Sequence, residues 1–152
     1  MKLIKISIAF LMILLIGGCG IKIPHSKNVA YDQNLSSNKK AKLLVKRFVE
    51  YWDARVRGDA KKSWEYELPY QKYLTDFQTY RKLLTGYEKS QIVLKRIIFQ
   101  NNNKALIERE VFIGHKEKVN KKDKWYYVKD NWYHKFYQSA LPPKTVEEAK
   151  FQ

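Results

Sequence analysis

The hydrophobic periodicity of this chain changes near Ser90, and this change limits the folds that it can adopt. Between residues 41 and 56, apolar side chains recur at spacings of three and four, which places them on one face of a helix. Beyond Ser90 the apolar positions alternate, as in a half-buried strand. Helices followed by neighbouring strands predict an α+β domain, with three N-terminal helices packed on a four-stranded antiparallel meander.

The first predicted helix carries the strongest pattern. Ser37 or Asn38 can accept a hydrogen bond from its first turn, and Gly58 can end it. Its apolar face must lie against the rest of the domain. The members of this face are Ala41, Leu44, Val45, Phe48, Trp52 and Val56.

Two shorter helices are predicted before the strands. Asp59 can cap the second helix, which Pro69 stops because proline cannot continue a helix. A third helix is expected to start at Thr75, where Gln78 completes the spacing of a capping box, and to end at Gly86.

The run 91–114 predicts a hairpin whose strands are separated by Asn101–Asn103. Asparagine tolerates the left-handed backbone of tight turns. With the last two asparagines as the central turn residues, Lys95 faces Glu110 in a favourable cross-strand pair. The same register makes Arg96 face Arg109.

Opposed arginines on an apolar side of a hairpin need an explanation, because like charges repel and an unpaired buried charge is costly. A core carboxylate such as Glu50, Glu65 or Asp76 can pair with them. Alternatively, that side of the hairpin is partly wet, and both side chains reach outward. As a third alternative, both guanidinium groups bind an anionic ligand.

A second hairpin is predicted over residues 124–138, with Asp130 and Asn131 in its turn. The basic stretch 115–122 before it is expected to form a loop or a bent extension of a strand. The predicted register has two facing pairs, Trp125 with Phe136 and Tyr127 with His134.

The first residues have the composition of an export signal. Lys2 and Lys5 precede an apolar run over residues 6–16, which is too short for an ordinary transmembrane helix. The junction Leu15–Cys19 resembles a bacterial lipobox. In lipoproteins a peptidase cuts before the cysteine, and its thiol carries fatty acyl chains. A plain signal peptide and an uncut membrane anchor are the alternatives.

The lipoprotein interpretation divides the chain into four parts. These are a signal peptide (1–18), a lipidated Cys19 with a flexible tether (19–38), an α+β domain (39–140) and a tail (141–152). The domain is expected in the cell envelope, on the periplasmic or extracellular face of a membrane. Gly20, rather than aspartate, follows the cysteine, which in Gram-negative lipoproteins implies release toward the outer membrane.

The basic composition fits either an anionic partner or an ordinary solvated surface that keeps the protein soluble. The formal net charge is +15, and an exported protein meets anionic lipid or an acidic partner protein more readily than nucleic acid. Eleven Tyr, seven Phe and four Trp predict an aromatic core or pocket rather than a disordered chain.

The order of elements is similar to the NTF2-like, cystatin-type cone fold. The resemblance lies in the long first helix with Phe48 and Trp52, the break at Gly58–Ala60, Leu68–Pro69, and the aromatic hairpin 124–133. It implies a curved sheet around the first helix with an open-ended pocket. The family includes isomerases, dehydratases, non-catalytic binding modules and secretion-system components, so the resemblance leaves function open.

No cofactor or metal site is predicted, because His25, His115 and His134 are isolated in the sequence and no phosphate-binding loop occurs. The catalytic candidates are His134 with Asp53 or Tyr127, which would transfer a proton in an NTF2-like enzyme.

The preferred hypothesis is a non-catalytic binding module that holds an anionic small molecule or a partner protein in the aromatic cone. Its predicted ligand-binding residues are Arg96, Arg109, Tyr127 and His134. The alternatives are the enzyme above and a structural component of a secretion or envelope complex.

Overall fold

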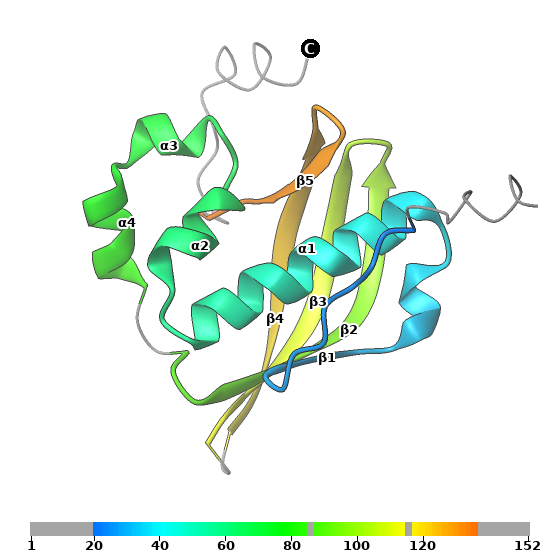
Figure 1. Ribbon diagram of the computed structural model, residues 1–152, viewed down its shortest axis with the longest axis horizontal. Helices are drawn as coiled ribbons and strands as arrows, with labels where there is room; N and C mark the ends of the chain where they lie inside the picture. The colour runs from blue at the N-terminus through cyan, green and yellow to red at the C-terminus, as the bar shows by residue number, and fades with distance from the viewer. Residues whose placement is uncertain (1–19, 85–86, 115–116, 137–152) are drawn as a thin grey trace, which may run out of the picture.

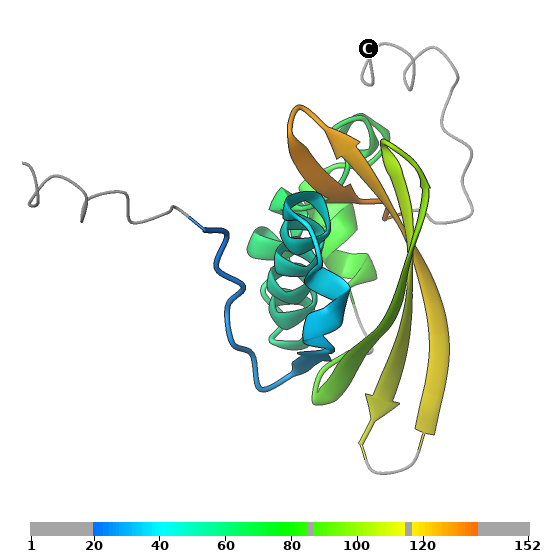
Figure 2. The same cartoon turned by 90° about the vertical axis from the view of Figure 1, so that its right-hand side faces the viewer.

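The computed structural model of the protein describes residues 20–84, 87–114 and 117–136, and they form an α+β domain. Its helices cover one face of a curled five-stranded sheet, with α1 lying across the strands (Figures 1 and 2). In chain order the elements are β1 (Val29–Tyr31), the 3-10 helix η2 (Gln33–Ser36), α1 (Lys39–Val56), α2 (Ala60–Glu65), α3 (Gln71–Leu74), α4 (Phe77–Leu83), β2 (Ser90–Asn101), β3 (Lys104–Ile113), β4 (Glu117–Val128) and β5 (Asn131–His134).

The α+β prediction is confirmed, and the predicted four-stranded meander gains a fifth strand. The sheet order is β1-β2-β3-β4-β5. Strands β2 to β5 pair antiparallel, while β1 lies parallel to β2 through Val29 and Ile92. A short helix, α3, is also added before α4.

Much of the predicted tether belongs to the folded domain. Val29 is buried in β1, and Ile23 packs against the core. Ser26 and Asn28 donate hydrogen bonds to Asp53 Oδ1 over 2.6 and 3.1 Å. The prediction of a flexible segment to residue 38 was wrong because a single parallel strand of three residues leaves no periodicity of its own.

The structure of α1 agrees with its sequence pattern. The side chain of Asn38 accepts a hydrogen bond from Ala41 N, so Asn38 is the N-cap. Gly58 follows the helix with a φ of +74°, a backbone conformation that favours glycine. All of the predicted apolar face is buried, which means that Ala41, Leu44, Val45, Phe48, Trp52 and Val56 are in the core.

Aromatic side chains fill the space between α1 and the sheet. Phe48 contacts Trp52 and Trp125 with ring centroids 6.4 and 6.3 Å apart, and Tyr51 meets Trp125 edge-on at 5.7 Å. These rings are fully or almost fully buried. Large aromatic rings that meet in tilted and edge-on geometry contribute both burial and favourable ring contacts.

The helix that was predicted to start at Thr75 begins two residues later. Asp76 is the N-cap of α4, and its side chain accepts a hydrogen bond from Thr79 N. The predicted end at Gly86 lies outside the described residues. The second helix agrees with its predicted cap, since the side chain of Asp59 accepts from Lys62 N.

The predicted register of the first hairpin holds only at its turn. Asn101 pairs with Lys104 around the predicted turn, but the register then shifts between Phe99 and Asn101 and again between Leu94 and Arg96. As a result Arg96 pairs with Glu108 and Leu94 with Arg109, so the two arginines do not face each other. Each β-bulge inserts one unpaired residue, which a simple alternation count cannot include. The expected Lys95–Glu110 contact still forms, at 3.9 Å.

The second hairpin turns one residue earlier than predicted. Lys129 and Asp130 occupy the turn with φ values of 46° and 59°. Two left-handed residues are typical of a tight hairpin turn. The pairs are therefore Trp125 with His134 and Tyr127 with Trp132, which replace the predicted pairs of Trp125 with Phe136 and Tyr127 with His134.

We expect Asn38, the N-cap of α1, to contribute more to stability than its neighbour Ser37. Asn38→Ala removes an acceptor from an otherwise unpaired amide of the first turn and should destabilise the protein by about 1 kcal/mol. Ser37→Ala is the matched control and should change the free energy of unfolding by less than about 0.5 kcal/mol. Urea denaturation measures both, and equal effects would contradict the assignment of the cap.

Candidate functional site

A buried carboxylate lies where the helices meet the edge of the sheet. Glu67 belongs to a short segment that pairs with β5, through a parallel bridge between Glu67 and His134. Leu68 N donates to His134 O, and His134 N donates to Tyr66 O. This pairing turns the side chains of Glu67 and His134 toward the same interior, and the Glu67 side chain is fully buried.

Three side chains converge on the Glu67 carboxylate. Tyr51 OH and Tyr80 OH donate to Oε1 over 2.8 and 3.0 Å, and Oε2 lies 2.9 Å from His134 Nδ1. We call Glu67, His134, Tyr51 and Tyr80 the carboxylate cluster. Because an ionised carboxylate only accepts hydrogen bonds, the contact with His134 favours a proton on Nδ1.

The surroundings of the cluster keep its tyrosines protonated. Burial, reinforced by the charge of Glu67, raises the pKa of Tyr51 well above its ordinary value. Burial and Glu67 raise the pKa of Tyr80 in the same way. Arg55 Nη1 donates to Tyr51 OH over 2.9 Å, and Tyr80 OH lies 3.0 Å from Ser63 Oγ. The cluster is thereby connected to α1, α2 and α4.

A second buried charge pair lies on the sheet beneath α1. Arg109 Nε donates to Asp123 Oδ2 over 2.7 Å, and Trp52 Nε1 donates to the same oxygen over 3.1 Å. The guanidinium carbon of Arg109 lies 3.8 Å from the ring centroid of Trp52. Arg109 Nη1 is buried without a hydrogen-bond partner. The structure thus pairs Arg109 with a core carboxylate, although not with Glu50, Glu65 or Asp76.

Arg96 lies in a different environment, on the exposed side of the sheet. Its Nη2 lies 2.9 Å from Glu108 Oε2, and Lys122 Nζ lies 3.3 Å from the other oxygen of that carboxylate.

A hollow of about 340 Å³ lies beside this ion pair. It is lined by Lys95, Glu108, Arg109, Glu110, Asn120, Lys121 and Lys122. Basic and acidic side chains alternate there, so they largely neutralise each other.

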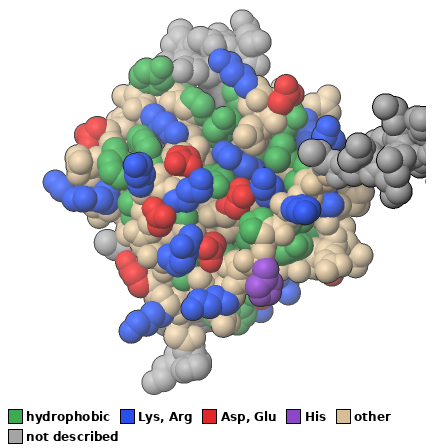
Figure 3. Space-filling view, viewed as in Figure 1, with side chains coloured by type: hydrophobic (Ala, Val, Ile, Leu, Met, Phe, Trp, Pro, Cys, Tyr) green, Lys and Arg blue, Asp and Glu red, His purple; other side chains and the backbone are tan. Residues whose placement is uncertain are grey.

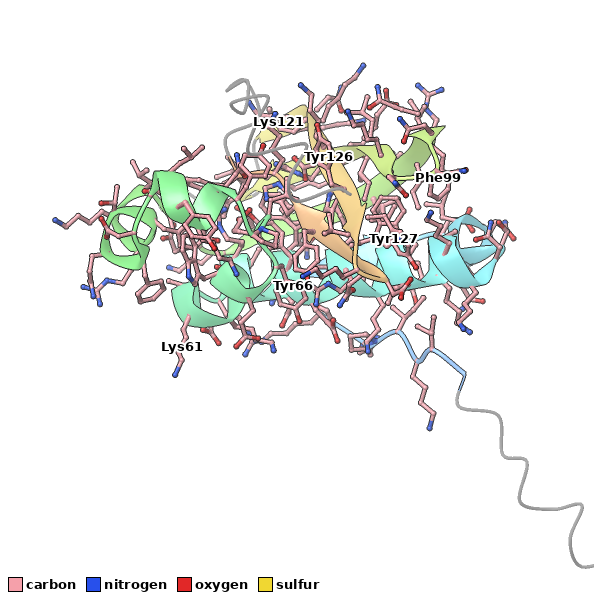
Figure 4. The ribbon with its side chains drawn as sticks, turned by 90° about the horizontal axis from the view of Figure 1, so that it is seen from above. Lys61, Tyr66, Phe99, Lys121, Tyr126 and Tyr127 are labelled. Carbon is pink, nitrogen blue, oxygen red and sulfur yellow. The ribbon has the colours of Figure 1, made fainter. Side chains whose placement is uncertain are left out.

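The predicted site residues are only partly brought together. His134 and Arg109 both contact Trp52, the histidine ring at 6.2 Å between centroids. Tyr127 lies near the hairpin turn, with its ring tilted against that of Trp132 at 5.1 Å between centroids, and is labelled in Figure 4. Arg96 is exposed, so the four predicted ligand-binding residues do not line one common pocket.

Asp53 faces the N-terminal segment instead of His134. Its carboxylate accepts from Ser26 and Asn28 and lies 2.9 Å from Arg57 Nε. Burial opposes its ionisation, but these hydrogen bonds and Arg57 together lower the pKa of Asp53 from its ordinary value. Asp53 is therefore a structural partner of residues 26–28.

Sequence reasoning missed both interior carboxylates, Glu67 and Asp123. Extending the alternation of β4 toward the N-terminus would have placed Asp123 on the same side as Trp125, paired with Ile107 and diagonal to Arg109. Glu67 has no comparable local signal, because its partner His134 lies 67 positions away.

Within residues 20–84, 87–114 and 117–136, no three His, Cys, Asp or Glu side chains form a group that could hold a metal ion. Over the same ranges, no helix combines the length and the apolar character needed to cross a membrane. Cys19 and His115 lie outside the described residues.

Comparison with known proteins gives only a distant structural likeness. No protein-family model matches the chain, and no curated protein matches it. A SEC-C motif-containing protein from Psychrobacter arcticus has a TM-score of 0.46 and 13% identity, over 68% of this chain and 62% of that chain. One from Rhodopseudomonas palustris has a TM-score of 0.39 and 15% identity, over 62% of this chain and 73% of that chain. At these TM-scores the likeness carries no argument about function.

We expect substitutions of Arg109 and Arg96 to have very different effects on stability. Arg109→Met leaves Asp123 buried with only Trp52 Nε1 as a partner, and we expect a loss of about 3–5 kcal/mol in the free energy of unfolding. Arg96→Met is the matched control on the same sheet, and loss of its exposed ion pair should cost at most about 1 kcal/mol. Urea denaturation measures both variants. Equal losses in the free energy of unfolding would show that the buried Arg109–Asp123 pair stabilises the fold no more than the exposed ion pair of Arg96 does.

Proposed function

We propose that this protein is a lipid-anchored protein of the bacterial cell envelope, with an NTF2-like domain that acts as a non-catalytic interaction module. The anchor follows from the resemblance of Leu15–Cys19 to a lipobox, behind a cationic and apolar leader. The helices on one face of a curled sheet support the NTF2-like interpretation.

One observation carries the non-catalytic assignment. The ionisable side chains of the interior are buried and are hydrogen-bonded or ion-paired to one another: Glu67 with His134, and Arg109 with Asp123. A general acid or base must come within hydrogen-bond reach of a substrate atom, directly or through one water. Groups that are enclosed and paired with each other in this way stabilise the fold and do not present reactive atoms to a ligand.

The surface then becomes the place where the domain meets a partner. The chain carries a net charge of +15, of which Lys2 and Lys5 are lost with the leader. On the face where α1 lies, basic and acidic side chains are interspersed (Figure 3). An exported domain with an excess of positive charge meets an anionic headgroup layer or an acidic partner more readily than nucleic acid.

Proton transfer by an NTF2-like enzyme is the second candidate function, and the carboxylate cluster is the observation that favours it. A carboxylate at 2.9 Å from an imidazole, with two tyrosine hydroxyls beside it, has the composition of an acid–base site. Catalysis at this site requires that a substrate reach His134, whereas the side chain of His134 is only 5% exposed.

Chemical modification separates the two functions. Diethyl pyrocarbonate acylates accessible imidazoles, so a brief treatment of the native protein should modify exposed His25 and leave buried His134 largely unmodified. Peptide mapping by mass spectrometry measures both residues, and treatment in urea should modify them equally. Modification of native His134 at the rate of His25 would support the enzyme.

The anchor has its own test. The native protein should begin at Cys19 and carry fatty acyl chains, and it should partition into the detergent phase of Triton X-114. Cys19→Ser removes the only thiol of the chain and should abolish both the acyl mass and the partitioning. A free thiol at residue 19 in the wild-type product, or a retained leader, would overturn the anchor.

A further inference from the structure

The link between the proposed anchor and the folded domain is short. Ile23 packs against the core, and Ser26 is held by its hydrogen bond to Asp53. An extended chain spans at most about 3.6 Å per residue, so the four steps from Cys19 to Ile23 reach at most about 14 Å. An acylated Cys19 would therefore keep the domain against the bilayer, and one particular surface must face the lipid.

The chain enters the domain at the end where α1 begins (Figure 1). Seen from above, Phe99 and Tyr127 lie at this same end, whereas Lys61 lies at the opposite end (Figure 4). The turns of both hairpins also belong to this end, because Lys40 of α1 contacts the first turn at Asn102 O and the ring of Tyr127 beside the second.

Lysine and aromatic side chains are combined on this surface. Lys40 Nζ lies 4.0 Å from the ring centroid of Tyr127 and 5.6 Å from that of Trp132. Phe99 packs on Trp132 at 6.0 Å between centroids, yet remains 44% exposed. Phe99 is one of few large apolar side chains that the described domain leaves so exposed. Aromatic rings beside lysines are typical of residues placed at a membrane–water interface.

The charges around these rings are mostly positive. Lys39 and Lys40 occupy the first turn of α1, which contains no acidic residue, and Lys129 is exposed in the turn of the second hairpin. Asp130 is the acidic neighbour in that turn. Anionic headgroups attract each nearby lysine by an amount that corresponds to about fivefold in partitioning.

We propose that this end of the domain, which we call the anchor-side surface (Lys39, Lys40, Phe99, Asn102, Tyr127 and Lys129), rests on the anionic headgroups of the bilayer that holds the acyl chains. This proposal depends on the lipid anchor. It fixes the orientation of the domain, so that α2 and Lys61 point away from the membrane and remain available to a partner in the envelope.

Site-directed spin labels test this orientation. Acylation of Cys19 leaves no other native thiol, so Asn102→Cys and Lys61→Cys each provide one labelling position in the full lipidated protein. The proteins are reconstituted into phosphatidylcholine vesicles with or without phosphatidylglycerol. On anionic vesicles, the label at 102 should lose severalfold in accessibility to a water-soluble nickel chelate, while the label at 61 should retain it.

Charge variants provide the matched comparison. Lys39→Gln combined with Lys129→Gln should restore the accessibility of the label at 102, and so should high salt. The control carries the label at 102 together with Lys61→Gln and Lys82→Gln. In this control, the label should remain as inaccessible to the nickel chelate as it is without these substitutions. Equal accessibility of the labels at 102 and 61 in acylated wild-type background would overturn the proposed orientation.

Two further outcomes are distinct. Mass spectrometry of the same samples reports acylation, so a sample without acyl chains refutes the anchor itself rather than the orientation. The label at 102 could be shielded in native membranes but exposed in anionic vesicles that contain no other protein. This result would show that a partner protein covers the surface, and it would overturn lipid as the occupant.

Discussion

The buried carboxylate of Glu67 joins three separate parts of the fold in the interior. Through Tyr51 it holds α1, through Tyr80 it holds α4, and through His134 it holds the edge strand β5. An ionised carboxylate in an apolar interior is tolerated only when donors surround it, and removing one partner of a buried charge costs about 3–5 kcal/mol. The positions of α1, α4 and β5 are therefore coupled through this side chain, in addition to the hydrogen bonds that Arg47 and Lys40 of α1 make with Trp132 of β5.

Trp52 connects this cluster to the second buried pair. The centroid of its ring lies 3.8 Å from the guanidinium carbon of Arg109 and 6.2 Å from the ring centroid of His134. Its indole nitrogen donates a hydrogen bond to Asp123. The aromatic residues that the sequence offers as a pocket lining thus serve as packing between two polar centres. The interior is specified by directional contacts, and such polar contacts discriminate among alternative packings more sharply than apolar contacts alone.

The parts of the structure that follow from local rules were predictable from the sequence. The apolar face of α1, its cap at Asn38 and the left-handed residue at Gly58 all depend on neighbours within a few positions. The hairpin registers failed because each of two bulges in β2 shifts the pairing by one position, and a turn one residue earlier shifts the pairing of the second hairpin by two. Glu67 was missed for a different reason, since without a local pattern a buried carboxylate is recognisable only by a distant partner, here His134. The inward position of Asp123 does follow from the alternation of β4 once that strand is extended.

The parallel strand β1 has the largest consequence for the proposed lipid anchor. A composition rich in Lys, Ser and Asn suggests a free tether, but Val29 pairs with Ile92, and Asp53 holds the residues just before it. A tether of twenty residues would let the domain tumble far from the membrane, where its lysines would lie beyond a Debye length of about 8 Å from the headgroups. With the fold beginning near Ile23, the proposed lipid anchor would bring the electrostatic attraction into close range, and the positions of lysines on the domain would then determine which face is left for a partner.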